Sequence, residues 1–158
     1  MEKTALRSHM LKSRQAMTGT EALSRSITER LLGWNDLADA RKIHIYRSRP
    51  GWREVDTARL INHIAGAMPT TSLVIGDVSR TAQLPDVIFD VIIVPLLAFD
   101  ADGRRLGLGG GWYDRFLANQ PQALTIGLAY EAQRVATVPT EPHDMPLDAV
   151  VTEAAIYR

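Results

Sequence analysis

Five of the eleven glycines in this 158-residue chain lie between Gly103 and Gly111, directly before Asp114. Glycine lets the backbone turn sharply and approach a ligand closely, so consecutive N–H groups can face phosphate oxygens. Arg104 and Arg105 add positive charge to the same segment. The segment therefore predicts a phosphate-binding loop that leads into a helix and holds a nucleotide in an α/β enzyme. A plain glycine-rich turn is the alternative. A Walker A loop is excluded, because no Gly-Lys-Ser/Thr sequence is present.

Charged and aromatic residues elsewhere in the chain give weaker signals. Lys3 and Arg7 lie four residues apart, so they would share one face of an N-terminal helix, where such charges are commonly only solvated. Trp34 and Trp52 are predicted to be packing residues, although Trp52 is close enough to Glu54 to line a pocket with it. The histidines have neither the spacing of a metal site nor that of a catalytic triad, and we assign no catalytic role to His9, His44, His63 and His143.

The elements that would position these residues alternate between helices and strands. A helix is predicted over residues 21–33, because apolar residues recur at every fourth position and Thr18 and Glu21 have the spacing of a capping box. A shorter helix is expected before it. Asp56 or Thr57 is expected to cap a later helix. Further strands are predicted over residues 42–47, 72–75, 123–128 and 149–152, with a helix over 112–118.

One strand should lie at the centre of the sheet. Residues 87–94 (VIFDVIIV) form an almost continuous β-branched run, which is typical of a strand buried on both faces, and Pro95 ends it. The glycine segment follows directly, at the sheet edge where open α/β folds bind ligands. The alternation predicts an α/β fold with three layers, in which a mainly parallel sheet is flanked by helices and residues 1–158 form a single domain.

The composition excludes several classes of protein. Lys plus Arg and Asp plus Glu each number 18, so the formal net charge is zero and no bulk basic field attracts nucleic acid. The absence of cysteine excludes disulfides, thiolate catalysis and thiolate metal sites. The sequence lacks the apolar core of a signal peptide and any apolar run of the roughly 20 residues that span a membrane. We expect a cytoplasmic monomer without nucleic-acid or membrane partners.

Several motifs occur together in a fixed order. The sequence strongly resembles the 5-formyltetrahydrofolate cyclo-ligases, also called methenyltetrahydrofolate synthetases, in four stretches: 94–100 (VPLLAFD), 103–117 (GRRLGLGGGWYDRFL), 127–133 (GLAYEAQ) and 138–152 (VPTEPHDMPLDAVVT). Residues 3–7 and 46–57 are similar to the two N-terminal motifs of the same family. The resemblance implies ATP- and Mg²⁺-dependent closure of 5-formyltetrahydrofolate to 5,10-methenyltetrahydrofolate, with ADP and phosphate as by-products.

The resemblance also assigns site residues. It implies that Lys3 and Arg7 contact the phosphates, that Asp114 and Asp144 serve Mg²⁺, and that Glu54 binds the pterin ring of the reduced folate. The implied ATP loop consists of Arg105, Leu106, Gly107, Leu108, Gly109, Gly110, Gly111, Trp112 and Tyr113. Taken alone, Asp114 would be a first-turn helix carboxylate, Asp144 a turn residue and Glu54 a residue before a helix cap. The catalytic residues stay unassigned.

The sequence departs from the family pattern around the substrate. Trp52 and Arg53 are inserted before Glu54, and Arg47 replaces a usual apolar residue. The segment around 69–86 is shortened where most members place extra strands and part of the substrate wall. Two alternatives to the cyclo-ligase therefore remain: an ATP-dependent kinase or ligase for another small molecule on the same scaffold, and a non-catalytic nucleotide-binding module.

Overall fold

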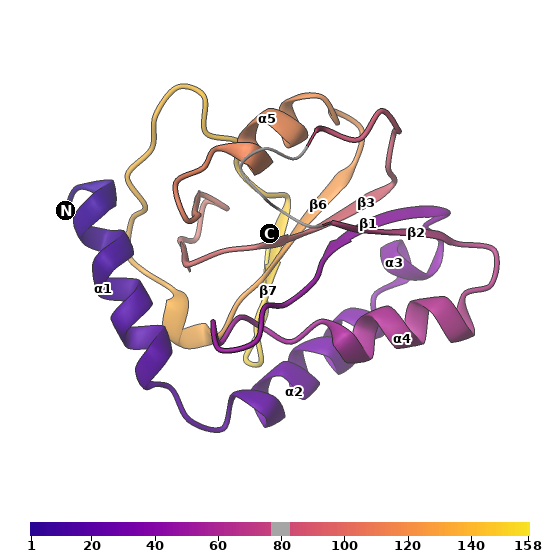
Figure 1. Ribbon diagram of the computed structural model, residues 1–158, viewed down its shortest axis with the longest axis horizontal. Helices are drawn as coiled ribbons and strands as arrows, with labels where there is room; N and C mark the ends of the chain where they lie inside the picture. The colour runs from indigo at the N-terminus through magenta and orange to yellow at the C-terminus, as the bar shows by residue number, and fades with distance from the viewer. Residues whose placement is uncertain (77–82) are drawn as a thin grey trace.

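A parallel sheet forms the centre of the molecule (Figure 1), and the computed structural model describes it through residues 1–76 and 83–158. Within these ranges the sheet has six strands in the order β2-β1-β3-β6-β7-β8, and all neighbours are parallel except β7 and β8. The strands are β1 (Lys42–Tyr46), β2 (Ser72–Gly76), β3 (Val91–Pro95), β6 (Leu124–Leu128), β7 (Ala149–Val151) and β8 (Ile156–Tyr157). The predicted α/β class with a mainly parallel sheet is confirmed. The segment around 69–86, expected to be shortened, lies partly outside the described residues.

The central strand is β3, as predicted, but it is shorter than its apolar sequence suggested. The prediction started the strand at Val87, whereas Val87 and Ile88 are 40% and 60% exposed. The side chain of Gln120 accepts a hydrogen bond from the Phe89 N–H and donates one to the Val87 carbonyl. The backbone of residues 87–89 is therefore held by the Gln120 side chain. Pairing of β3 with the neighbouring strands β1 and β6 begins only at Val91.

Helices cover both faces of the sheet (Figure 1). On one face α2 (Thr20–Leu32), α3 (Asn35–Ala38) and α4 (Ala58–Ala67) pack on alternate residues of β1 and β3, such as Ile43 and Ile93. On the other face α5 (Trp112–Ala118) packs on residues of the opposite parity, such as Ile92 and Val94. The strands are apolar on both faces because each face is covered in this way.

Helix α1 (Lys3–Ala16) lies apart from these layers, against a small antiparallel pair formed by β4 (Ala98–Phe99) and β5 (Arg105–Leu106). Leu6 and Met10 of α1 form a third apolar cluster with Leu97, Leu106 and Val138. This packing lays α1 along the segments that follow β3. The helix is 14 residues long, not the shorter one expected, and the β4–β5 pair, β8 and the short η1 (Glu131–Gln133) were not predicted.

The predicted helix caps were wrong in detail. Helix α2 follows Gly19, which has a left-handed backbone, and no side chain caps it, so the expected Thr18 capping box is absent. Thr57 precedes α4, but its hydroxyl donates to the Tyr46 carbonyl, while Asp56 accepts the hydrogen bond from the Ala58 N–H. Of the helices in the described part of the chain, none has the length and apolar character needed to cross a membrane.

Candidate functional site

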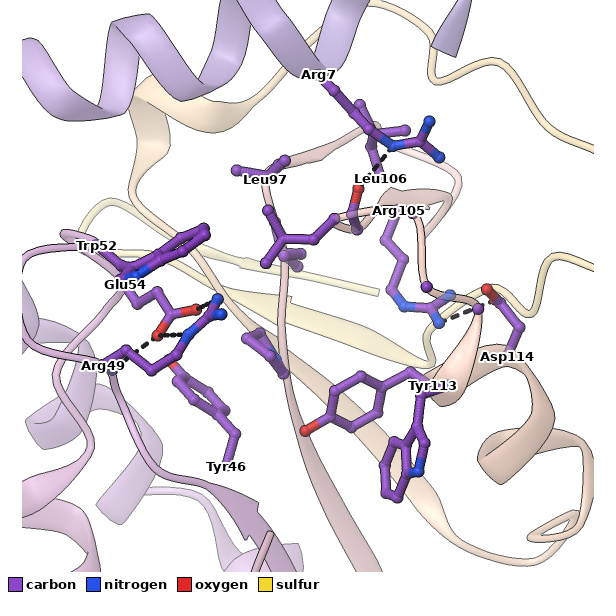
Figure 2. Close-up of a pocket in the computed structure, with 18 of the residues that line it drawn as sticks. Arg7, Tyr46, Arg49, Trp52, Glu54, Leu97, Arg105, Leu106, Tyr113 and Asp114 are labelled. Carbon is purple, nitrogen blue, oxygen red and sulfur yellow. Dashed lines mark hydrogen bonds and ion pairs between the residues drawn. The ribbon is translucent and has the colours of Figure 1, made fainter. Parts of the chain in front are cut away.

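A pocket of about 730 Å³ opens where β1 and β3 end (Figure 2). Its wall includes Tyr46 at the end of β1, Pro95 at the end of β3, residues of α1 and the glycine loop, which we define as residues 107–111. This is the volume range of small-molecule sites, roughly 300 to 1,000 Å³. The pocket therefore lies at the carboxyl ends of the parallel strands, as expected from the position of the glycine segment.

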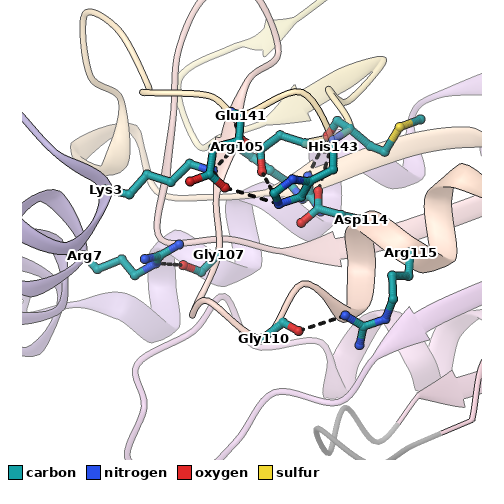
Figure 3. A network of polar contacts seen from close by, with 11 residues as sticks. Lys3, Arg7, Arg105, Gly107, Gly110, Asp114, Arg115, Glu141 and His143 are labelled. Carbon is teal, nitrogen blue, oxygen red and sulfur yellow. Dashed lines mark hydrogen bonds and ion pairs between the residues drawn. The ribbon is translucent and has the colours of Figure 1, made fainter.

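The glycine loop lies beside the side chain of Arg7 (Figure 3). Gly109 and Gly111 have φ values of 100° and 65°, which residues with a Cβ rarely adopt. A Cβ on Gly109 would lie 3.4 Å from the Arg7 guanidinium carbon. The Nε of Arg7 donates a 3.0 Å hydrogen bond to the carbonyl of Gly107. The structure thus brings Arg7 and the glycine loop together.

The other residues of the implied ATP loop face different surroundings. Leu106 is 1% exposed and belongs to the α1 cluster, so its side chain is a core residue. Trp112 is 5% exposed and its ring packs against Tyr113 and Phe116 of the core on the α5 face. Leu108 is 41% exposed at the pocket. Leu106, Trp112 and Tyr113 also line the pocket, although each of these residues is buried.

Lys3 joins α1 to the segment that contains Asp144. Its Nζ lies 2.5 Å from Asp144 Oδ2 and 3.1 Å from Glu141 Oε2. Burial alone would lower the pKa of Lys3, but the hydrogen bonds and charges of the two carboxylates outweigh it and raise that pKa. Likewise, burial opposes ionisation of Asp144, yet the contacts with Lys3 and the Glu141 N–H lower its pKa. Both groups are therefore charged near neutral pH.

Asp114 is held in the same manner by Arg105. Asp114 Oδ1 accepts hydrogen bonds from Arg105 Nη2 at 2.9 Å and from the Met145 N–H at 3.0 Å. Arg105 Nη1 also donates to the Met145 carbonyl at 2.6 Å, so its guanidinium ties the loop to the segment beside Asp144. Arg104, expected to add countercharge to the loop, is paired with Asp102 at 2.7 Å instead and does not line the pocket.

The two predicted metal residues lie in one pocket without forming a ready cluster. Asp114 and Asp144 both line it. Among the described residues, ligand atoms that lie within 4.8 Å of one another come from Glu141, His143 and Asp144, and Asp114 is not in that group. Carboxylate oxygens suit Mg²⁺, which commonly takes one or two of them together with phosphate oxygens and water. The donor chemistry fits Mg²⁺, although Lys3 and Arg105 hold both carboxylates in this structure.

Glu54 lies at the opposite end of the pocket, 9% exposed, with Arg49 against it (Figure 2). Arg49 Nη2 donates to Glu54 Oε1 at 2.7 Å, and the Arg49 backbone N–H donates to Oε2 at 2.9 Å. The Arg49 guanidinium also stacks 3.9 Å from the centre of the Trp52 ring. Trp52 is 39% exposed and covers Arg49, so it lines the pocket together with Glu54, which was the alternative to the packing role predicted for it.

Sequence reasoning missed two cations of this pocket, Arg14 and Arg49. Arg14 lies seven residues after Arg7, a spacing that keeps both on one face of a helix, so the face defined by Lys3 and Arg7 could have been extended to it. It is 3% exposed. No sequence periodicity marks Arg49. It contacts Glu54 only because the chain turns between the two residues, near Trp52.

Several known proteins are similar in sequence to this chain. A model of the 5-formyltetrahydrofolate cyclo-ligase family matches residues 75–153. The 5-formyltetrahydrofolate cyclo-ligase of Escherichia coli K12 is 47% identical over 77 residues, which are 48% of this chain and 42% of the relative. The chain thus spans less than half the length of that relative in the match. The cyclo-ligase of Mycoplasma pneumoniae is 30% identical over 97% of this chain and 99% of the relative.

The fold comparison agrees with the sequence comparisons. The NMR structure of Aquifex aeolicus 5,10-methenyltetrahydrofolate synthetase superposes with a TM-score of 0.80 and 28% identity, over 100% of this chain and 93% of that one. The resemblance inferred from the motifs is therefore confirmed over nearly the whole chain. The chain belongs to the 5-formyltetrahydrofolate cyclo-ligase family.

Proposed function

We propose that the chain catalyses the ATP- and Mg²⁺-dependent cyclisation of 5-formyltetrahydrofolate to 5,10-methenyltetrahydrofolate, with release of ADP and phosphate. The observation that carries the proposal is that one pocket joins a cationic glycine loop to a buried carboxylate, Glu54. Such a pocket offers a phosphate-binding end and a pterin-binding end in one space. Family membership supplies the identity of the two substrates.

The phosphate end would bind ATP. Lys3 and Arg7 bring positive charge from α1, and the loop from Arg105 to Tyr113 supplies backbone N–H groups at glycine positions. Asp114 and Asp144 would hold Mg²⁺, which supplies charge neutralisation for the phosphates. The phosphates would form ion pairs with Lys3 and Arg105. The carboxylates of Asp144 and Asp114, which these cations contact in this structure, would then be free to bind the metal.

The other end would bind the reduced pterin through Glu54. An ionised carboxylate accepts hydrogen bonds, and the N–H groups on the pyrimidine edge of a pterin are donors. The Arg49 side chain donates to Glu54 from a planar guanidinium, so the same geometry suits the amino-pyrimidine edge. Binding of the ring would therefore displace the Arg49 side chain from Glu54.

The proposed chemistry activates a poor electrophile. The formyl oxygen forms a bond to the γ-phosphorus of ATP as the bond to the bridging β-γ oxygen breaks and ADP leaves. N10 then attacks the activated formyl carbon, phosphate departs from that carbon, and N10 loses its proton. The chain contributes alignment of the two substrates and dispersal of charge, which are the main contributions of proteins to phosphoryl transfer.

The direct test mixes the protein with MgATP and 5-formyltetrahydrofolate and follows the near-ultraviolet absorbance of the methenyl product. We expect product formation that requires both ATP and Mg²⁺ and that falls in Glu54→Gln, because a neutral amide presents mismatched donors to the ring. Tight MgATP binding without any folate binding would contradict the proposal and favour a kinase or ligase for another small molecule. The cytoplasmic location and the monomeric state stay predictions.

A further inference from the structure

Arg14 is a buried guanidinium with most of its hydrogen-bonding capacity unused. Only 3% of the residue is exposed, although it lines the pocket. Its Nη1 donates a long 3.3 Å hydrogen bond to the Leu96 carbonyl. Among the described residues, Nε and Nη2 are buried without any hydrogen-bond partner. Buried polar groups are nearly always satisfied in native proteins, so two free donors on one side chain require an explanation.

The surroundings of Arg14 belong to the Glu54 end of the pocket. After burial, which lowers the pKa of Arg14, the largest influence on that pKa is the charge of Glu54, which raises it. Arg14 therefore carries a buried positive charge, and the carboxylate that influences its pKa most is already engaged by Arg49. Such a charge is unfavourable in a buried place unless a ligand supplies the acceptor.

The helix separates Arg14 from the phosphate end. Arg7 and Arg14 lie seven residues apart on α1, which corresponds to about 10 Å along a helix axis. Arg7 contacts the glycine loop through the Gly107 carbonyl, whereas Arg14 contacts the segment that follows β3. One helix thus presents cations to both ends of the pocket, Lys3 and Arg7 to one and Arg14 to the other.

We propose that Arg14 is a substrate-binding residue, whose Nε and Nη2 donate hydrogen bonds to an oxygen of the reduced folate beside the ring N–H groups that Glu54 accepts. The inference rests on the proposed function and extends it to a second residue. The amide-like edge of a pterin carries a ring N–H next to a ring carbonyl. A carboxylate and a guanidinium side by side match that donor and acceptor pair, and each would select against a ring with the opposite pattern.

The test compares Arg14→Met, Arg14→Lys and the control Lys12→Met, which removes an exposed cation from the same helix. Each protein is titrated with 5-formyltetrahydrofolate alone and with MgATP alone, and its thermal unfolding is recorded. For Arg14→Met we expect folate affinity to fall about tenfold to a hundredfold while MgATP affinity stays within about twofold. The melting temperature should not fall, because an unpaired buried charge has been removed.

Arg14→Lys should recover part of the folate affinity, because the charge remains but the planar donor pair is lost. Lys12→Met should bind both ligands like the wild type. Unchanged folate affinity in both Arg14 variants would overturn the inference, as would a parallel loss of both affinities with a lower melting temperature. A loss confined to MgATP would also overturn it, since the acceptor would then be a phosphate. If the wild type binds MgATP but no folate, the proposed function fails and this inference fails with it.

Discussion

Arg49 already occupies the hydrogen-bonding positions of Glu54 that a pterin would need. Its guanidinium and its backbone N–H both donate to the carboxylate, and Trp52 covers the guanidinium. The Arg49 side chain is 42% exposed, so solvent weakens this ion pair and a ligand can replace it. Any ligand of Glu54 must therefore compete with a group of the protein itself.

This competition gives a prediction of unusual direction. Arg49→Met should tighten the binding of 5-formyltetrahydrofolate by about threefold to tenfold, because the ligand no longer has to break the ion pair. Arg53→Met is the matched control, since it removes the same charge from the same turn and the Arg53 side chain donates to the Met17 carbonyl instead of to the Glu54 carboxylate. Titration of the two variants and the wild type measures the effect. Weaker binding in Arg49→Met would mean that Arg49 positions Glu54 instead of competing for it.

The sequence motifs identified the charged residues of the pocket but not the residues with which they form ion pairs. Lys3, Arg7, Glu54, Asp114 and Asp144 all line the predicted pocket. The pairing of Lys3 with Asp144 joins residues 141 positions apart, and no local pattern encodes such a contact. The sequence also could not show that Lys3 and Arg105 hold the two proposed metal carboxylates, because only the folded chain brings these charges into contact.

The glycine loop is the element on which nucleotide binding should depend most directly. A side chain on Gly109 would both require a rare backbone conformation and press on Arg7, as the φ of 100° and the 3.4 Å contact show. The loop conformation and the position of α1 are therefore set together. A substitution that alters the loop conformation should therefore lower the affinity for ATP.

Gly109→Val should abolish MgATP binding while the protein remains folded. Gly66→Val in α4 is the control, because a Cβ there meets no atom within 4 Å and the position is far from the pocket. Calorimetric titration with MgATP, together with a thermal unfolding curve for each variant, separates the two effects. A folded Gly109→Val protein with wild-type affinity would remove the loop from the nucleotide site.

The contact between α1 and the segment of residues 141–144 leads to a prediction about Mg²⁺. Mg²⁺ alone should leave the melting temperature unchanged, because Lys3 and Arg105 hold the carboxylates of Asp144 and Asp114. MgATP at about 100 times its dissociation constant should raise it by roughly 5 to 10 °C, which corresponds to about 2.7 kcal/mol of ligand stabilisation. ATP with a chelator should have a smaller effect. A clear rise with Mg²⁺ alone would show a metal site that is already formed.

Element types were predictable where one periodicity dominates, and their ends were not. The parallel strands and α5 follow from apolar runs and alternation. The start of β3 was misplaced because the side chain of Gln120, in the connection after α5, bonds the Phe89 N–H and the Val87 carbonyl. The β4–β5 pair was missed because each strand has only two residues and depends on packing against α1.

On the scale of the whole molecule, a buried histidine links the sheet to the helix that follows the glycine loop. His44 on β1 is 1% exposed and packs against the rings of Phe89, Phe116 and Trp112 on the α5 face. Burial lowers its pKa to about 4. In the folded protein the His44 imidazole therefore stays neutral down to about pH 4. In the unfolded chain it binds a proton with the ordinary histidine pKa of about 6.5.

Stability should consequently decline in acid. Because the folded pKa of His44 lies below the unfolded one, its contribution is complete above about pH 6.5 and is lost as the pH falls towards 4. Between pH 7 and pH 4.5 the wild type should lose about 2 to 3 kcal/mol through this residue. Urea unfolding at both pH values should show a smaller loss in His44→Leu than in the wild type and in His63→Leu, an exposed control on α4. Equal losses in all three proteins would remove His44 as the cause.

The long-range packing of α1 also determines when the pocket can form during synthesis of the chain. Leu6 and Met10 leave the ribosome long before Val138, their partner in the third apolar cluster, and Lys3 precedes Asp144 by 141 residues. At about 5 to 20 residues per second, the helix waits on the order of 10 seconds for these partners. A nascent chain therefore carries an exposed apolar helix face and an incomplete pocket until Val138 and Asp144 have been made, and this is the period in which a chaperone would protect it best.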